Sequence, residues 1–277
     1  MPTVAERLRH IELKVERANK HIIDLEREIA AFLGSNPYQV RSKRNPDTRQ
    51  LIYYLAEVKS TPDCLALIAG DCIQNLMCAL DHLAYQLVSS DTNDAPPNPN
   101  RIYFPIADTE EKYEARKHGK MEGAHPDTMA AIDALKPYQG GNEPLWMLYK
   151  LNNVEKHRLL ITVGSMFQSV NVGASVSAIF TKLMGSDQNS PFLGKEFPIF
   201  DTFLTPADTL FPLKAGDELF VDAVDAEENP KTQFAFSVAL YEPQVIKAKS
   251  IVETIHQMTA LVKGIVAALT PRLKDTA

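Results

Sequence analysis

Apolar residues in the N-terminal part of the chain recur in alternating steps of four and three residues. The series starts at Val4, Leu8 and Ile11 and continues to Phe32. This spacing places a narrow apolar seam along one face of a long helix, and the GSNP sequence at positions 34–37 ends it. A single helix of this kind is unstable alone. We therefore expect it to pack in a bundle or across a subunit boundary.

The next apolar patterns predict a β-hairpin and two further helices. Residues 38–58 form the hairpin, with its turn at Asn45-Pro46-Asp47. Thr61 is the expected N-cap of a helix that runs to about Val88, because Pro62 suits the first helical position. Pro144 starts another helix, which extends to about Leu160.

Beyond Leu160 the pattern changes to β-branched residues punctuated by glycine. This composition predicts strands over residues 161–180. Residues 218–224 and 232–241 are expected to pair as a hairpin, and a helical pattern returns over 243–269 before Pro271. The expected fold class is α+β, mainly a helical bundle with an N-terminal β-hairpin and an inserted antiparallel β-sheet. We predict one domain over 1–277, in which the bundle comprises 1–37, 59–160 and 243–271 and the β-rich insertion comprises 161–242.

Composition narrows the class of protein. The chain has 277 residues, of which 45% are hydrophobic, but no uninterrupted apolar run reaches roughly 18 residues. The N-terminus is charged, unlike a signal peptide. The 3 cysteines, Cys64, Cys72 and Cys78, fall in one helical segment and match neither a disulfide framework nor a zinc finger. We therefore expect a cytoplasmic protein without a membrane span.

The charge balance argues against long nucleic acids as partners. The formal net charge is −6, a poor electrostatic match for a polyanion, and nothing in the sequence points to DNA. A local basic cluster occurs at positions 41–49, with Arg41, Lys43, Arg44 and Arg49. We interpret it as solvated surface.

Two of the predicted helices each carry a polar stripe that ends in a histidine. At about 100° per residue, the members of each stripe share one narrow face of their helix. The first stripe consists of Asp71, Asn75, Cys78 and His82, and the second of Trp146, Lys150, Asn153 and His157. Buried polar groups are costly unless they are partnered. The stripes therefore predict a polar seam and a functional pocket between the two helices.

These residue types suit acid–base chemistry on an anionic substrate. Histidine changes charge near neutral pH, which makes His82 and His157 the candidate catalytic groups. Arg158 and Lys156 are cationic groups for gripping an anion, and the polar side chains expected to bind alongside them are Asp71, Asn75, Lys150 and Asn153. A metal site formed by His82, His157 and Asp71 is the least favoured hypothesis, because no local two-ligand motif is present. We accordingly predict no metal and no cofactor.

At these residues the chain resembles known families. The segments NLMCALDHLAYQLV and LWMLYKLNNVEKHR, with FPI and KPYQGG between them, resemble a group of uncharacterised bacterial proteins that carry an Ala-Leu-Asp-His helix and a Lys-His-Arg helix. More distantly, the first helix resembles the HEPN superfamily of helical domains. The resemblance implies RNA cleavage without metal, often by dimers, through an Arg-x4-His signature with the ribose 2′-hydroxyl as nucleophile. His82 matches the histidine, whereas Met77 stands where the signature has arginine, so Arg158 or Lys156 would have to supply the charge.

Two hypotheses of different classes follow from the sequence. In the first, the protein binds or cleaves RNA, with His82 as general base or acid and Arg158 or Lys156 as the phosphate contact. In the second, it is a non-catalytic binding module, and the polar stripes form a hydrogen-bonded network that fixes the register of the helices. We also expect a homo-oligomer, since a homodimer is the commonest closed assembly.

Overall fold

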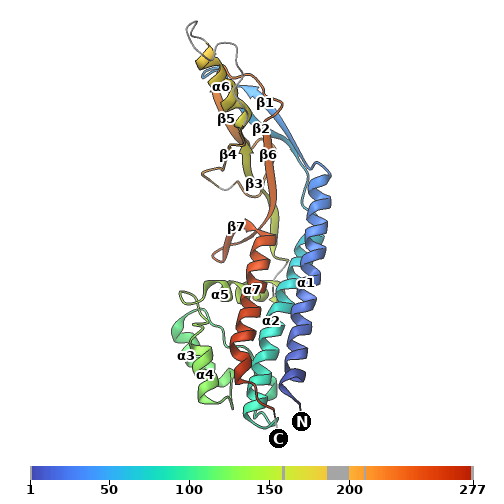
Figure 1. The fold of residues 1–277 in the computed structure, drawn as a ribbon, viewed down its shortest axis with the longest axis vertical. Coiled ribbons are helices and arrows are strands. Elements are labelled where there is room, and N and C mark those ends of the chain that lie inside the picture. The colour runs from blue at the N-terminus through green and yellow to red at the C-terminus, as the bar shows by residue number, and fades with distance from the viewer. Residues whose placement is uncertain (1, 158–159, 186–199, 209, 276–277) are drawn as a thin grey trace. The chain divides into compact units, whose positions relative to one another are not determined.

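The computed structural model describes residues 2–157, 160–185, 200–208 and 210–275 (Figure 1). Contacts within the chain divide it into two compact units. The helical unit comprises Met1–Ile29, Pro62–Val163 and Leu240–Ala277, and the β-rich unit comprises Ala30–Thr61 and Gly164–Ala239. The fold is mixed α+β with antiparallel strand pairs, as the sequence predicted. The assignment of the whole chain to one domain stays a prediction.

The helical unit contains the long helices that the apolar periodicity predicted. Their bounds are α1 Val4–Gly34, which ends in the β-rich unit, α2 Asp63–Asp91, α3 Glu110–Lys120, α4 Pro126–Asp133, α5 Glu143–His157 and α7 Ile251–Leu269, with short 3-10 helices η1 Pro99–Arg101 and η2 Thr270–Arg272. Along α1 the predicted seam from Ile11 to Phe32 is buried within this chain. The seam is therefore used inside the subunit.

Helix α2 lies in the hydrophobic core of this unit. Leu76, Leu80, Leu83 and Leu87 are all 0% exposed, because leucines at this spacing share one helical face. Among the described residues, α2 is the one helix that is long and apolar enough to cross a membrane. However, 56% of its most apolar window is buried inside the protein. That is the property of a core helix.

The strands form two sheets. The first has the order β1-β2-β5 and the second the order β4-β3-β6-β7. Their bounds are β1 Tyr38–Arg44, β2 Gln50–Val58, β3 Thr162–Asn171, β4 Phe203–Leu204, β5 Glu218–Val224, β6 Gln233–Glu242 and β7 Ile246–Ser250. The β1–β2 pairing confirms the predicted hairpin. A core that includes Leu55, Phe167 and Leu213 fills the β-rich unit, and Phe234 and Phe236 of β6 pack against it.

The predicted pairing of residues 218–224 with 232–241 is wrong. Strand β5 instead pairs antiparallel with β2, whereas β6 lies between β3 and β7 in the other sheet. Aromatic packing supports the observed pairing, since the rings of Tyr53 on β2 and Phe220 on β5 stack with centroids 6.2 Å apart. Strand partners are chosen by such non-local contacts.

Two further predictions in this region need correction. Strands were expected over 161–180, but only β3 forms, and helix α6, Gly173–Gly185, follows it. The side chain of Asn171 accepts a hydrogen bond from the backbone N–H of Gly173 at 3.0 Å and so favours the start of a helix there. The helix expected from position 243 begins only at Ile251, because residues 246–250 form β7 and Ser250 then caps the helix by accepting from the Glu253 N–H.

Two of the four basic side chains in the cluster at positions 41–49 form ion pairs within the β-rich unit. Lys43 pairs with Glu218 at 2.9 Å, and Arg49 pairs with Asp225 at 2.7 Å. Arg44 donates to the backbone carbonyls of Arg49 and Ala226. The ion pairs offset two of the four positive charges, whereas the bonds to carbonyls leave the charge of Arg44 in place.

Candidate functional site

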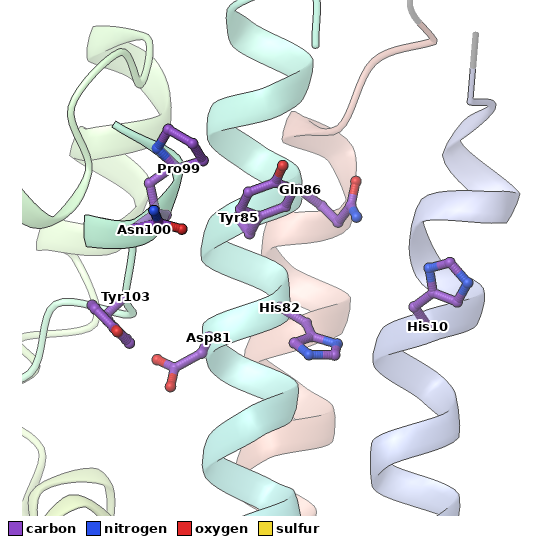
Figure 2. Close-up of a pocket in the computed structure, with 9 residues that line it drawn as sticks. His10, Asp81, His82, Tyr85, Gln86, Pro99, Asn100 and Tyr103 are labelled. Atoms are coloured by element: carbon purple, nitrogen blue, oxygen red, sulfur yellow. The ribbon is translucent and has the colours of Figure 1, made fainter. Parts of the chain in front are cut away.

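A cavity of about 530 Å³ opens in the helical unit beside α1, α2 and η1. Its lining combines two histidines, a carboxylate, two tyrosines and two amides (Figure 2). The lining residues are His10, Asp81, His82, Tyr85, Gln86, Pro99, Asn100, Ile102 and Tyr103. This volume lies within the range of about 300–1,000 Å³ that is typical of small-molecule sites.

Helix α2 supplies the centre of the lining because its opposite face is anchored in the core. Leu80 and Leu83, on either side of the Asp81-His82 pair, are 0% exposed. Figure 2 shows the His82 ring on the side of α2 that faces His10 of α1, whereas Asp81 projects toward Tyr103. The two neighbours diverge because consecutive helical residues point about 100° apart.

The surroundings of His82 favour the neutral form of its ring. Partial burial lowers the pKa of the His82 imidazole below its ordinary value of 6.5, since burial penalises the charged form. The positive charge of Lys14 and the His10 ring lower that pKa further, and Asp81 opposes them. A neutral imidazole at neutral pH can accept a proton, as a general base must.

Asp81 joins the cavity to the segment that follows η1. Its Oδ1 accepts a hydrogen bond from the backbone N–H of Phe104 at 3.0 Å, and the Phe104 side chain is 1% exposed. Burial raises the pKa of the Asp81 carboxyl, while the Phe104 N–H and the charges of Lys156 and Lys120 oppose that shift. Lys156, predicted as an anion contact, therefore acts electrostatically on Asp81.

A buried arginine fixes the side chain of Gln86 in the lining of the cavity. Arg7 of α1 is 1% exposed. Its Nη1 donates to Gln86 Oε1 at 2.8 Å, and its Nη2 pairs with Asp94 at 2.6 Å. A charge-assisted hydrogen bond of this kind orients the amide and ties α1 to the end of α2.

The remaining polar residues predicted on α2 do not line this cavity. Asp71 is exposed and Asn75 is half-buried. The Asn75 amide donates to the backbone carbonyl of Asp71 at 2.8 Å, so it is engaged by its own helix. Met77, at the position of the signature arginine, is 4% exposed and points into the core. His82 is therefore the only member of the first stripe among the lining residues.

The described residues of the second stripe line a different cavity. Lys150 and Asn153 of α5 border a space of about 440 Å³ together with Trp146. Lys150 Nζ lies 3.1 Å from Asp108 Oδ1. His157 ends α5, but its side chain and Arg158 lie outside the described residues. The structure thus separates Lys150 and Asn153 from the cavity of His82.

Sequence reasoning missed six polar residues of the His82 cavity: His10, Asp81, Tyr85, Gln86, Asn100 and Tyr103. A signal was available for those that lie on α1 and α2. Tyr85 follows His82 by one helical turn, and His10 precedes Ile11 of the apolar seam, where a side chain borders the neighbouring helix. Asn100 and Tyr103 depend on the path of a loop. No cluster of three or more metal-ligating side chains occurs among the residues that the structure describes.

Comparison of the chain with protein-family models, curated proteins and solved structures found no match.

Proposed function

We propose that this protein is a HEPN-like RNA-binding protein that cleaves single-stranded RNA without a metal ion. The observation that carries the proposal is the presence of His10 and His82, from two different helices, at one cavity. A pair of histidines can supply both the base and the acid that phosphodiester cleavage needs. The lowered pKa of His82 supports the role of base for this residue.

In the proposed reaction the ribose 2′-hydroxyl attacks the adjacent phosphorus. His82 accepts the proton of that hydroxyl as the bond between phosphorus and O2′ forms. His10, in its protonated form, donates a proton to O5′ as the bond between phosphorus and O5′ breaks. The products are a 2′,3′-cyclic phosphate and a free 5′-hydroxyl, and both histidines then return to their starting protonation states through solvent.

The lining of the cavity suits a short single strand better than a duplex. Tyr85 is 38% exposed and Tyr103 is 51% exposed, so both rings are accessible for stacking on unpaired bases. Lys14 contributes positive charge near His82. In the proposed site it would bind the phosphate in place of the signature arginine, whose position is occupied by Met77. The net charge of −6 disfavours a long polyanion. The substrate would therefore engage the protein over a few nucleotides.

The test uses the purified protein with a fluorescently labelled single-stranded RNA in the presence of a chelator. We expect cleavage products that end in a 2′,3′-cyclic phosphate. His82→Ala and His10→Ala should each lower the rate by about 10²-fold or more, as the loss of a general acid or base does. His118→Ala, at an exposed position of α3, is the matched control and should cleave at the wild-type rate. Cleavage that persists in both cavity variants would refute the assignment.

A non-catalytic binding module is the second candidate. It is favoured by the contacts of Asn75, which bonds to its own helix, and of Lys150, which pairs with Asp108. Residues engaged in this way contribute to structure. RNA that stays intact with the wild-type protein, while His82→Ala lowers the melting temperature, would support this candidate over the enzyme.

A further inference from the structure

The second cavity of the helical unit is built from one face of α5 and a tight turn. Trp146, Lys150, Asn153 and Val154 recur at helical spacing, so they form one wall. The opposite wall is the turn between β6 and β7, residues 242–245, and Asp108 and Gln139 complete the lining. The volume is about 440 Å³. All of these residues belong to the helical unit, and none of them lines the cavity of His82.

Intramolecular bonds hold the charged groups of this cavity in place. Burial alone would raise the pKa of Asp108, but the hydrogen bond and charge of Lys150 bring it below its usual range, so this carboxylate is ionised at neutral pH. The Glu242 side chain is held by Thr162, whose backbone N–H and hydroxyl both donate to Oε1, at 3.0 and 3.2 Å. A site whose polar groups are already fixed loses little entropy on binding a ligand.

Two features of the walls are costly in the protein alone. Gln244 adopts a φ of 64°, a left-handed conformation that side chains other than glycine rarely take. Trp146 is 5% exposed, and its indole Nε1 is a buried donor that lacks a well-aligned hydrogen bond. It nevertheless lies near enough to Asp108 to lower the pKa of that carboxyl. Backbone strain and incompletely paired buried donors concentrate at ligand sites.

The chemistry of the lining selects a neutral ligand. The ammonium of Lys150 is already paired with Asp108 at 3.1 Å, and the carboxylate of Glu242 already accepts two hydrogen bonds from Thr162. The charged groups of the lining are therefore engaged within the protein and do not call for a charged ligand. Three amides, those of Gln139, Asn153 and Gln244, each offer a donor and an acceptor. A hydroxyl group also both donates and accepts, so several hydroxyls on a small frame match this lining.

We propose that this cavity binds a small, neutral, hydroxyl-rich molecule of monosaccharide size. The amides supply the hydrogen bonds that recognise the hydroxyls, and the apolar side chains of Val154, Pro243 and Val245 cover its carbon face. The site is independent of RNA cleavage.

Saturation-transfer NMR on the full chain tests this proposal. The probes are D-glucose, D-ribose and myo-inositol, with glucose 6-phosphate as the anionic and glucosamine as the cationic comparison. We expect at least one neutral probe to bind more tightly than both charged probes. Asn153→Leu, which keeps the side-chain volume and removes the amide, should weaken that binding about tenfold or more. Asn75→Leu makes the same change on α2 outside the cavity and should bind like the wild type.

Several results would overturn the proposal. It fails if none of the neutral probes binds, if a charged probe binds best, or if Asn153→Leu binds normally. Should circular dichroism show that Asn153→Leu does not fold, Gln139→Ala takes its place, because Gln139 lies in an exposed loop. Normal binding by a folded Gln139→Ala would then also count against the site.

Discussion

At the scale of single residues, Gly70 shows how closely α2 and α5 approach each other. A Cβ atom added at Gly70 would lie 2.5 Å from Cδ of Glu155, closer than real Cβ atoms come to their neighbours. Burial raises the pKa of the Glu155 carboxyl, and the nearby charge of Asp71 adds to that effect, whereas the backbone N–H of Ile161 opposes it. The glycine therefore makes room for a carboxylate whose Oε2 atom is buried without a hydrogen bond among the described residues.

Gly70→Ala should therefore forgo the gain that alanine normally brings to a helix. In an open position the same change stabilises a helix by about 1 kcal/mol, and Gly264 of α7, which has nothing within 4 Å of its added Cβ, provides that matched control. At Gly70 the Glu155 carboxylate must move out of its place, so we expect a free energy of unfolding at least about 1 kcal/mol below that of Gly264→Ala. Urea denaturation measures both. Equal stabilisation by the two changes would contradict the close contact.

The pKa of His82 can be measured directly by NMR titration of its ring. We expect a value below 6.5 because of burial, Lys14 and His10. Lys14→Ala should raise it, whereas Lys20→Ala, a matched change at an exposed position of α1, should leave it in place. A histidine with a lowered pKa in the folded state binds its proton more readily when unfolded, so the free energy of unfolding should fall as pH drops below 6.5. If the pKa of His82 is the same in Lys14→Ala as in the wild type, the charge of Lys14 does not act on His82.

At the scale of elements, Asp91 joins the end of α2 to two other segments. Its side chain is 1% exposed. Oδ2 accepts from the backbone N–H of His125 at 2.9 Å and from the Thr128 hydroxyl at 2.8 Å, at the start of α4. Oδ1 accepts from Lys274 near the C-terminus at 2.8 Å. A single buried carboxylate thus fixes both segments to the core helix.

Asp91→Ala should destabilise the protein by about 1–3 kcal/mol, because it leaves the hydroxyl of the buried Thr128 without its hydrogen-bond acceptor. Lys274→Ala removes only the solvent-exposed partner and should cost no more than about 1 kcal/mol. Hydrogen exchange should accelerate in the first turn of α4 in Asp91→Ala and remain slow there in Lys274→Ala. If both variants lose the same small amount of stability, Asp91 does not join these elements.

The elements differ in how far the sequence alone determines them. The helices α1, α2 and α5 were predicted because the periodicity of apolar residues that indicates a helix is local in sequence. Strand pairing joins segments that are far apart in sequence. Nothing in residues 218–224 indicates that they pair with β2, which lies near the start of the chain. Helix α6 was missed because its β-branched residues favour strands in isolation, whereas the cap at Asn171 and tertiary packing decide otherwise.

The candidate site was predictable to a similar extent. His82 was found because its polar character contrasts with the leucines around it on α2. The second predicted histidine, His157 of α5, has its side chain outside the described residues, so its place in the cavity stays a prediction. Among the described residues, the histidine that lines the cavity with His82 is His10 of α1. Choosing between these helices requires knowing which one packs beside the exposed face of α2, and amphipathic patterns do not contain that information.

At the scale of the whole molecule, the two units have separate cores. In the β-rich unit Phe167 is 2% exposed and packs against Phe234 and Phe236, with ring centroids 6.4 and 5.9 Å away. In the helical unit Ile73 of α2 is 0% exposed. Separate cores permit separate cooperative unfolding, because each unit buries its own apolar surface.

Phe167→Ala tests whether the chain unfolds as one domain or as two. The substitution should cost about 3–5 kcal/mol, since it opens a cavity in the aromatic core. With two cooperative units, hydrogen exchange should accelerate through β2, β3 and β6 while the amides of α2 keep their protection. Ile73→Ala, the reciprocal change, should accelerate exchange in α2 and α7 and spare the strands. Uniform acceleration throughout the chain in both variants would instead establish the single domain over residues 1–277 that the sequence predicts, with its helices and strands unfolding together.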